Sequence, residues 1–290
     1  MFNPTSIEDV ITRDPAFMDP EFPPTITPFY FESSGSRVFG DFYLAQGSET
    51  KGVVIVSTQM FGGESLDSVI HPIMMSGMHV IKYHPRGMWD NKHKYSKGSA
   101  ADDLNSLVEF VRSCSAPQRK TPGGLTYRVD PDRIALFGLS GGGGAVSYAV
   151  CAERDDINYA IAVAPGNMQH QLTPEWREKN KAFYQAAKEM TGGRIDLESS
   201  LGQVTQAEMD RFDLIKLAPK LASKHLLLIG ASHDTVSPVE VCHKPIARAL
   251  QAAKAAHFTE VIFESNHRLL TKRIALARLL ISWLRSEGGF

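Results

Sequence analysis

A glycine-flanked serine is the first group in the sequence with the means to do chemistry. Residues 138–142 read GLSGG and match the pattern GxSxG, between the apolar run 134–137 and the helix-compatible segment 145–152. On a sharp turn from strand to helix, a serine projects above the sheet, and small neighbours let strand and helix approach closely. The motif therefore predicts that Ser140 is a nucleophile and that the backbone N–H of Gly141 stabilises an oxyanion. A glycine-rich turn without chemical significance is the alternative.

A serine hydroxyl needs a neighbouring base before it attacks a carbonyl carbon. Where GxSxG marks such a turn, the acid and then the histidine follow later in the chain. Asp234 comes just after the apolar run 226–229, and His267 comes just after 259–263. Loops at the carboxyl ends of late strands are where these groups belong. We predict that His267 takes the proton of Ser140 and that Asp234 orients the imidazole.

Both assignments have ordinary alternatives. An aspartate in a turn usually forms the turn or caps a helix, and His267 could cap a helix or lie exposed. His233 sits beside the acid, but neighbouring side chains diverge in an extended loop, so we expect it to stay outside the site. Glu264 is a weaker rival for the acid.

Short apolar runs alternate with helix-compatible segments from residue 52 onward. Runs buried on both faces are typical of a parallel sheet covered by helices, so we predict an α/β fold with a mostly parallel, doubly wound sheet. An N-terminal hairpin pairs 27–32 with 37–45. The other predicted strands are 53–56, 79–83, 134–137, 159–163, 226–229 and 259–263, and the predicted helices include 100–113, 239–255 and 272–284.

One long segment interrupts this alternation after the sixth predicted strand. It contains a charged helix at 174–190 and a capping box of Thr205 and Glu208 that starts a second helix. We interpret it as an inserted helical lid. The predicted organisation is an N-terminal extension at 1–26, a core at 27–166 and 223–290, and a lid at 167–222.

The loop after the first core strand should help to stabilise the oxyanion. Residues 57–63 read STQMFGG. From about residue 40 to its end, the chain resembles the α/β-hydrolase superfamily, in particular stand-alone relatives of prolyl-oligopeptidase catalytic domains and of dienelactone hydrolase. The resemblance implies a second oxyanion donor here, the N–H of Phe61 or alternatively of Met60. Such proteins usually carry His-Gly where this chain has Gln59 and Met60, a departure that leaves the exact donor open.

A second loop also carries the resemblance. Residues 84–90 read HPRGMWD and are similar to the family's Asp-x-Arg-Gly loop, with His84 in place of the acid. We expect a structural role for Arg86. Asp102 and Asp103 resemble the acidic start of the following helix, and helix capping accounts for them.

Five apolar or aromatic residues are candidates for substrate contact. Met88 and Trp89 could line the pocket. Trp176, Phe183 and Tyr184 could reach the substrate from the lid, although packing of the lid on itself explains them equally well.

The resemblance implies a serine hydrolase that cleaves a carboxylic ester, or a related acyl bond, through an acyl-enzyme. The same fold and triad also serve peptide or C–C bond hydrolysis, acyl transfer and biosynthetic cyclase or lyase steps, and some relatives only bind. The sequence shows no large N-terminal propeller of the oligopeptidase kind, which favours an ester.

Composition excludes several other classes. The 290 residues are 43% hydrophobic and carry a formal net charge of −1, which gives no electrostatic basis for binding nucleic acid or an anionic membrane. We expect a cytoplasmic protein without signal peptide or membrane span, acting on a small-molecule acyl substrate; a homodimer is compatible with the sequence. The sequence has no HExxH motif, no clustered His/Cys set and no GxGxxG motif after its first strands. We therefore expect neither a bound metal nor a cofactor.

Overall fold

A mixed β-sheet forms the centre of the computed structural model, which describes residues 11–57, 66–88, 93–113, 118–122, 124–195 and 204–290. The predicted oxyanion donors Phe61 and Met60, and the predicted pocket residue Trp89, lie outside the described residues. The strands are β1 Thr25–Ser33, β2 Ser36–Leu44, β3 Lys51–Ser57, β4 His79–Tyr83, β5 Gln118–Lys120, β6 Thr126–Leu139, β7 Tyr159–Val163, β8 His225–Ala231 and β9 His257–Phe263.

The sheet is mixed and mostly parallel, which confirms the predicted mostly parallel sheet. Its neighbours run β1-β2-β4-β3-β6-β7-β8-β9, and the short β5 pairs with β6. The β1–β2 hairpin is antiparallel and joins β4 in an antiparallel pair, whereas all pairs from β4 through β3 to β9 are parallel. Parallel order brings the carboxyl ends of β6, β8 and β9 to the same edge, where GLSGG and the predicted acid and base follow.

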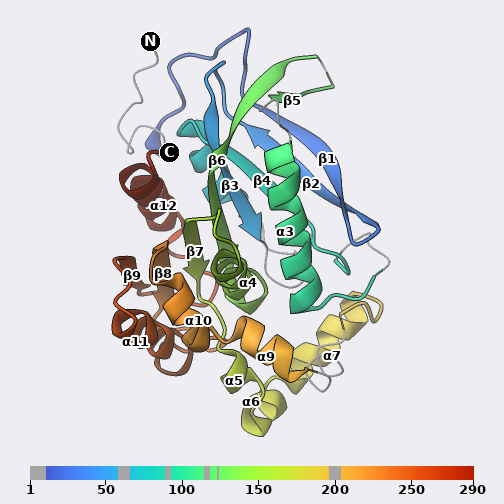
Figure 1. Ribbon diagram of the computed structural model, residues 1–290, viewed down its shortest axis with the longest axis vertical. Coiled ribbons are helices and arrows are strands. Elements are labelled where there is room, and N and C mark those ends of the chain that lie inside the picture. The colour runs from blue at the N-terminus through green and yellow to red at the C-terminus, as the bar shows by residue number, and fades with distance from the viewer. Residues whose placement is uncertain (1–10, 58–65, 89–92, 114–117, 123, 196–203) are drawn as a thin grey trace.

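Helices cover both faces of this sheet (Figure 1). On one face α3 packs against α4, and α10 packs against α4 and α11; on the other, α12 packs against α2. The helical segments are α2 Asp67–Met75, α3 Lys97–Ser113, α4 Ser140–Glu153, α5 Met168–Gln171, α6 Pro174–Lys179, α7 Lys181–Met190, α9 Gln206–Phe212, α10 Leu214–Leu221, the π-helix Val239–His243, α11 Lys244–Ala252 and α12 Arg273–Gly288.

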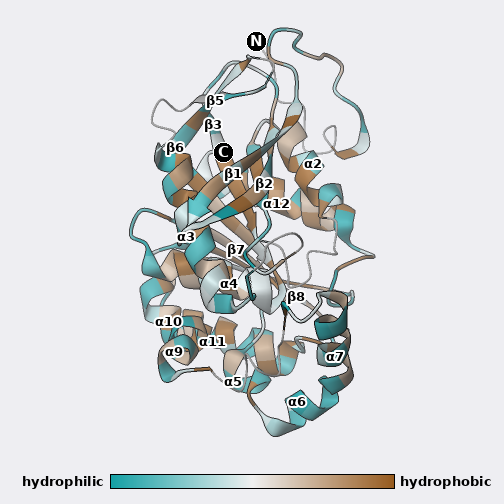
Figure 2. Ribbon diagram, turned by 90° about the vertical axis from the view of Figure 1, so that its right-hand side faces the viewer, coloured by the Kyte–Doolittle hydropathy of each residue, from teal (hydrophilic) through white to brown (hydrophobic). Residues whose placement is uncertain are grey.

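Apolar side chains of the strands contribute to a separate hydrophobic core on each face of the sheet, as the apolar runs predict. In β3, Val53 and Ile55 belong to the core under α3 and α4, while Val54 and Val56 belong to the core under α2 and α12. Figure 2 shows apolar residues gathered along these inner surfaces. The strand β9 departs from the prediction, because it is the edge strand and its side chains are exposed or half-buried.

Several helices differ in detail from the prediction. The charged helix expected at 174–190 is two helices, α6 and α7, which meet at Asn180. The helix expected at 239–255 begins as a π-helix before α11. The predicted capping box is confirmed, since Thr205 and Glu208 bond to each other's backbone N–H at the start of α9.

Arg86 has the structural role that we expected, but helix capping is the wrong explanation for the two aspartates. The buried carboxylate of Asp103, well inside α3, accepts from Arg86 Nε at 2.6 Å and from the Arg86 backbone N–H at 2.8 Å. Asp102 pairs instead with Arg211 at 2.9 Å. Both carboxylates lie beyond the first turn of α3, so they anchor neighbouring segments to it.

A buried histidine ties three strands together at the end of the sheet remote from Ser140. His79 opens β4 and is fully buried. Its Nδ1 accepts from the backbone N–H of Ala45 at 3.1 Å, and its Nε2–H donates to the carbonyl of Arg128 in β6 at 3.0 Å. Acceptance at Nδ1 requires the neutral imidazole, and burial lowers the pKa of His79 to about 3.

This histidine should make the fold sensitive to acid. In the unfolded chain His79 takes up a proton near pH 6.5, whereas in the folded protein it does so only near pH 3. The free energy of unfolding is therefore highest above pH 6.5 and falls as the pH is lowered toward 3, by up to about 1.4 kcal/mol per pH unit. Urea unfolding at several pH values should therefore show the free-energy advantage over His79→Gln shrinking toward low pH. The exposed His71 provides a control, since His71→Gln should keep the original pH slope; parallel curves for all three proteins would contradict this.

The helix α4 crosses so close to the end of β6 that glycine is required there. A Cβ on Gly138 would lie 2.1 Å from the carbonyl oxygen of Gly143, and a Cβ on Gly144 would lie 3.1 Å from the oxygen of Gly138. A Cβ on Gly98 in α3 would lie 3.4 Å from its nearest neighbour, a carboxylate oxygen of Glu208. The two positions therefore differ sharply in their tolerance of alanine.

We expect Gly138→Ala to lower the free energy of unfolding by about 3 kcal/mol, because backbone must move to admit the methyl group. Gly98→Ala should leave stability unchanged or raise it by up to about 1 kcal/mol, because alanine favours a helix. Chemical denaturation of both variants makes the comparison. Equal stability of the two would show that the close approach of α4 and β6 is not a constraint.

Candidate active site

Ser140 sits in a strained turn between β6 and α4. Leu139 is the last residue of β6, with an extended backbone at φ −111°, and Ser140 opens α4 with φ +66°. The left-handed region costs a residue with a Cβ on the order of 1 kcal/mol or more, so it persists only where the surrounding structure imposes it. Here the glycine contacts between β6 and α4 impose it.

The predicted serine, histidine and aspartate meet at the carboxyl edge of the sheet. His267 Nε2 lies 3.0 Å from Ser140 Oγ, and His267 Nδ1 lies 2.7 Å from Asp234 Oδ2. The carboxylate only accepts, so Nδ1 carries the proton and Nε2 is left to accept from the serine hydroxyl. The fold thus brings into hydrogen-bond contact residues that are 127 positions apart (Ser140 and His267) and 33 positions apart (Asp234 and His267) in the sequence.

Asp234 is held in one orientation by its own loop. Its Oδ1 accepts from the backbone N–H groups of Val236 and Ser237 at 2.8 and 2.7 Å, which leaves Oδ2 directed at His267. The side chain of Asp234 is fully buried, and that of His267 is 12% exposed. A buried carboxylate with its hydrogen bonds satisfied is suited to stabilise an imidazolium.

Backbone hydrogen bonds join the loops that carry the acid and the base. The N–H of Ser232 donates to the carbonyl of Phe263 at 2.9 Å, and the N–H of His233 donates to that of Ser265 at 3.0 Å. The β8–β9 pairing thus continues into both loops, and Asp234 and His267 are positioned as one unit.

The two rival residues lie outside this arrangement. The side chain of His233 is 70% exposed and lies 4.0 Å from that of Glu264, which is 83% exposed. They face solvent together, as expected for side chains that diverge from the line of Asp234 and His267.

The start of α4 offers a backbone donor beside Ser140. Gly141 is the second residue of this 14-residue helix, and the first four N–H groups of a helix have no acceptor within it. The partial positive charge of a helix N-terminus would favour an oxyanion there. The second donor, predicted at Phe61 or Met60, remains a prediction.

The predicted pocket residues fall into two groups. Met88 is buried in the core between the sheet and α3. In α6 and α7, Trp176 and Tyr184 are also buried and lie against each other, with ring centroids 5.7 Å apart, whereas Phe183 is 45% exposed. Trp176 and Tyr184 thus pack against each other, and a contact of any of these residues with substrate remains a prediction.

Sequence reasoning missed a polar pair beside the turn. The amide nitrogen of Gln171 would lie 3.2 Å from a Cβ on Gly141, so it fills the space that this glycine leaves. The amide oxygen of Gln171 lies 2.6 Å from Lys97 Nζ. No motif marks either residue, because the first comes from α5 and the second from the start of α3.

Lys97 has no anionic partner within the described chain. Of the described residues, no carboxylate lies within ion-pair distance of its ammonium group, which contacts Gln171 and, at 3.5 Å, the sulfur of Met168. Burial lowers the pKa of Lys97 to about 8. A cation without a counter-ion thus lies one glutamine side chain away from Gly141.

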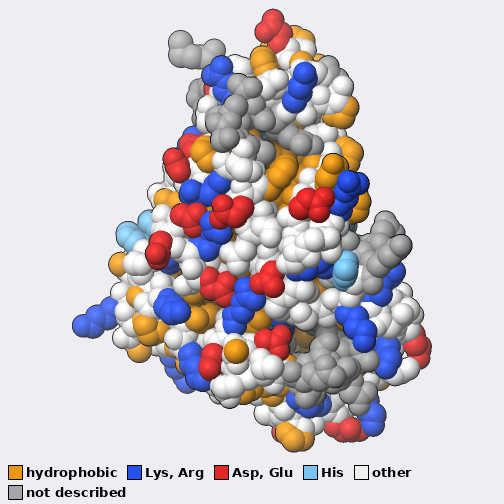
Figure 3. Space-filling model, turned by 45° about the vertical axis from the view of Figure 1, so that its right-hand side comes forward, with side chains coloured by type: hydrophobic (Ala, Val, Ile, Leu, Met, Phe, Trp, Pro, Cys, Tyr) orange, Lys and Arg blue, Asp and Glu red, His pale blue; other side chains and the backbone are white. Residues whose placement is uncertain are grey.

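The described residues contain one group of three potential metal ligands, away from this site. His225, His257 and Glu287 gather at the opposite edge of the sheet, where β8 and β9 begin. Charges of both signs are interspersed on the surface in Figure 3. Among the described helices, none combines the length and apolar character needed to cross a bilayer.

Comparisons of structure give the same fold. An esterase of Pyrococcus furiosus superposes with a TM-score of 0.68 at 12% identity over 91% of each chain. A puromycin-hydrolyzing peptidase of Mycobacterium tuberculosis superposes with a TM-score of 0.66 at 14% identity, over 95% of this chain and 41% of the peptidase. The acylaminoacyl peptidase of Pyrococcus horikoshii superposes with a TM-score of 0.63 at 15% identity, over 90% of this chain and 41% of the peptidase. The chain thus spans about two fifths of each of these peptidases and nearly all of the esterase.

Comparison of sequence gives the family. No curated protein matches the chain significantly. Residues 65–288 match the model of the prolyl oligopeptidase family, and this stretch includes the strand-turn-helix motif and the loops after β8 and β9. The chain belongs to the prolyl oligopeptidase family and is a serine hydrolase with the α/β-hydrolase fold.

Proposed function

We propose that this hydrolase cleaves carboxylic esters through an acyl-enzyme on Ser140. The observation that carries the proposal is the continuous hydrogen-bonded path from Asp234 through His267 to the serine oxygen, with steps of 2.7 and 3.0 Å. Each group in this path has the one role that its hydrogen bonds permit.

The proposed reaction has two halves. Ser140 Oγ attacks the acyl carbon while His267 Nε2 takes its proton, and the N–H of Gly141 stabilises the oxyanion. The new imidazolium is stabilised by Asp234, which stays ionised, and then protonates the leaving alcohol. Water, deprotonated by the same imidazole, next attacks the acyl-enzyme and releases the acid and the free serine.

Leaving-group chemistry favours an ester over an amide. An alkoxide or phenoxide leaves more readily than an amide anion, so an ester asks less of the proton donor in the first half-reaction. Peptide hydrolysis by the same three residues is the alternative outcome of the test.

Aryl esters and anilides with the same acyl group separate the two activities. We expect hydrolysis of p-nitrophenyl butyrate, and much slower or no hydrolysis of the matching p-nitroanilide. Ser140→Ala should lower the ester kcat by four orders of magnitude or more and abolish covalent labelling by a fluorophosphonate.

Histidine variants supply the matched control. His267→Ala should lose activity as Ser140→Ala does, while His233→Ala, which removes the exposed neighbour of the acid, should keep it. Ester hydrolysis that survives in Ser140→Ala would refute the mechanism. An anilide cleaved as fast as the ester would replace the esterase proposal by a peptidase.

The ammonium group of Lys97, which bonds to an amide oxygen and to no described carboxylate, supports one refinement of the substrate. Lys97 is half-buried and meets no carboxylate among the described residues, and a partly desolvated cation gains from an anionic ligand. Because Gln171 links it to the space beside Gly141, we propose that the preferred acyl group carries a second, free carboxylate. This refinement rests on the esterase proposal.

A charged and a neutral ester of matched length test the refinement. Lys97→Met should lower kcat/KM for the mono-p-nitrophenyl ester of succinic acid at least tenfold and leave that for p-nitrophenyl butyrate within about twofold, since a desolvated ion pair is worth on the order of 1.5–3 kcal/mol. Lys94→Met, at an exposed position three residues earlier, is the control. Equal losses on both esters, or no loss on either, would contradict the role of Lys97.

A further inference from the structure

The first residues of β8 and β9 place two histidines side by side. His225 and His257 are directly in register in this parallel pair. Neighbouring strands lie about 4.8 Å apart, so residues in register project from the same face at close range. The two imidazoles stack with centroids 4.0 Å apart and planes inclined by 18°.

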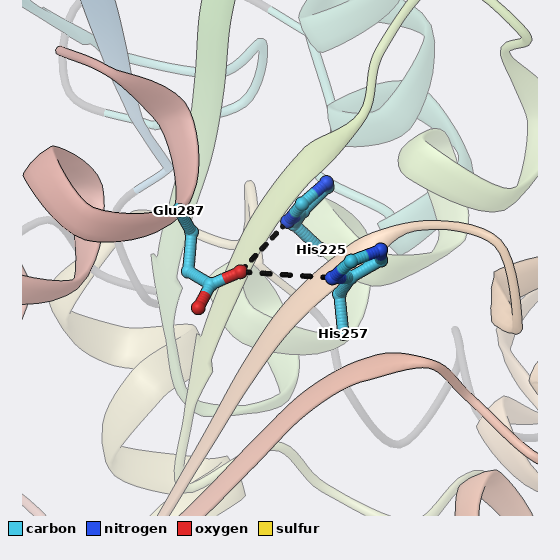
Figure 4. A group of neighbouring side chains, drawn as sticks. All are labelled: His225, His257 and Glu287. Atoms are coloured by element: carbon cyan, nitrogen blue, oxygen red, sulfur yellow. Dashed lines mark hydrogen bonds and ion pairs between the residues drawn. The ribbon is translucent and has the colours of Figure 1, made fainter.

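A carboxylate from the last helix faces both rings. Glu287, near the end of α12, places Oε2 3.0 Å from His225 Nδ1 and 3.8 Å from His257 Nδ1. All three ligand atoms lie within 4.8 Å of one another. Figure 4 shows both Nδ1 atoms directed at the glutamate and the two other ring nitrogens directed away from it.

We propose that His225, His257 and Glu287 form a binding site for a divalent transition-metal ion, with zinc the best match. Zinc takes imidazole nitrogen and carboxylate oxygen at about 2.0–2.2 Å, which puts neighbouring ligands of a tetrahedron about 3.3 Å apart. The distances of 3.0 and 3.8 Å bracket this value. Because the rings are nearly parallel, each must tilt about χ2 to aim Nδ1 at a common ion, and that torsion is soft.

The surroundings of the three side chains suit a bound ion. The side chains of His225 and Glu287 are 22% and 32% exposed and that of His257 is 50% exposed, so a hydrated ion can reach them and keep a water as fourth ligand. On its other side the ring of His225 lies against Tyr159, with centroids 4.8 Å apart. This contact limits the motion of one ligand and lowers the entropy lost on binding.

The position of the site implies a structural role. β8 and β9 start at the histidines, and the loops that carry Asp234 and His267 follow their other ends, seven residues further on. That is about 20 Å at 3.3 Å per residue, too far for the ion to touch the reacting atoms. A metal here would tie the exposed edge strand β9 to β8 and to α12, and so would stabilise the fold.

Titration with zinc after removal of bound metals by chelator tests the site. We expect about one strong site by calorimetry, a rise in the thermal unfolding midpoint, and visible absorption bands of tetrahedral cobalt when Co²⁺ replaces Zn²⁺. His257→Asn should weaken binding at least 100-fold and remove the stabilisation. Glu287→Gln, which keeps the shape of the side chain, should weaken it at least tenfold.

His71→Asn, on the exposed surface of α2, provides the matched control and should bind zinc as the unchanged protein does. Zinc binding that survives unaltered in both His257→Asn and Glu287→Gln would overturn the proposal, as would the lack of any strong site in the unchanged protein. Neither result bears on the esterase proposal, because every readout is independent of ester hydrolysis.

Discussion

The hydrogen bond between Asp234 and His267 is the interaction on which the proposed function depends. It fixes the proton on Nδ1, and only then can Nε2 accept from Ser140. The bond spans two loops, which are aligned because they extend neighbouring parallel strands and share backbone hydrogen bonds. The acid and the base are therefore positioned by the sheet.

A second constraint holds the nucleophile against this pair. Glycines at the crossing of β6 and α4 bring helix and strand so close that Ser140 takes a positive φ. Backbone strain of this kind must be supported by the rest of the fold, and the two cores on either side of the sheet supply the burial that supports it. Polar groups buried elsewhere in the fold, such as His79 and the pair of Arg86 and Asp103, have hydrogen bonds to the backbone or to each other.

Much of the fold could be predicted from local patterns. Short apolar runs indicated the strands, and those at His79–Tyr83 and Tyr159–Val163 have the predicted bounds. The errors came where tertiary contacts decide. Exposure of β9 follows from its place at the edge of the sheet, and the role of Asp103 follows from the approach of Arg86. The helix α2, absent from the prediction, lacks a side-chain cap and contains a proline.

By itself the sequence determined the candidate triad, because GxSxG between a strand and a helix, with an aspartate and a histidine after two later strands, leaves few other arrangements. It could not reveal the pairing of Lys97 with Gln171, or the meeting of His225, His257 and Glu287. These groups carry no motif and come from separate elements, 32 and 30 residues apart in the second case. Strand register and helix packing decide which side chains of distant segments come into contact. Register and packing in turn depend on the whole core, which no local pattern describes.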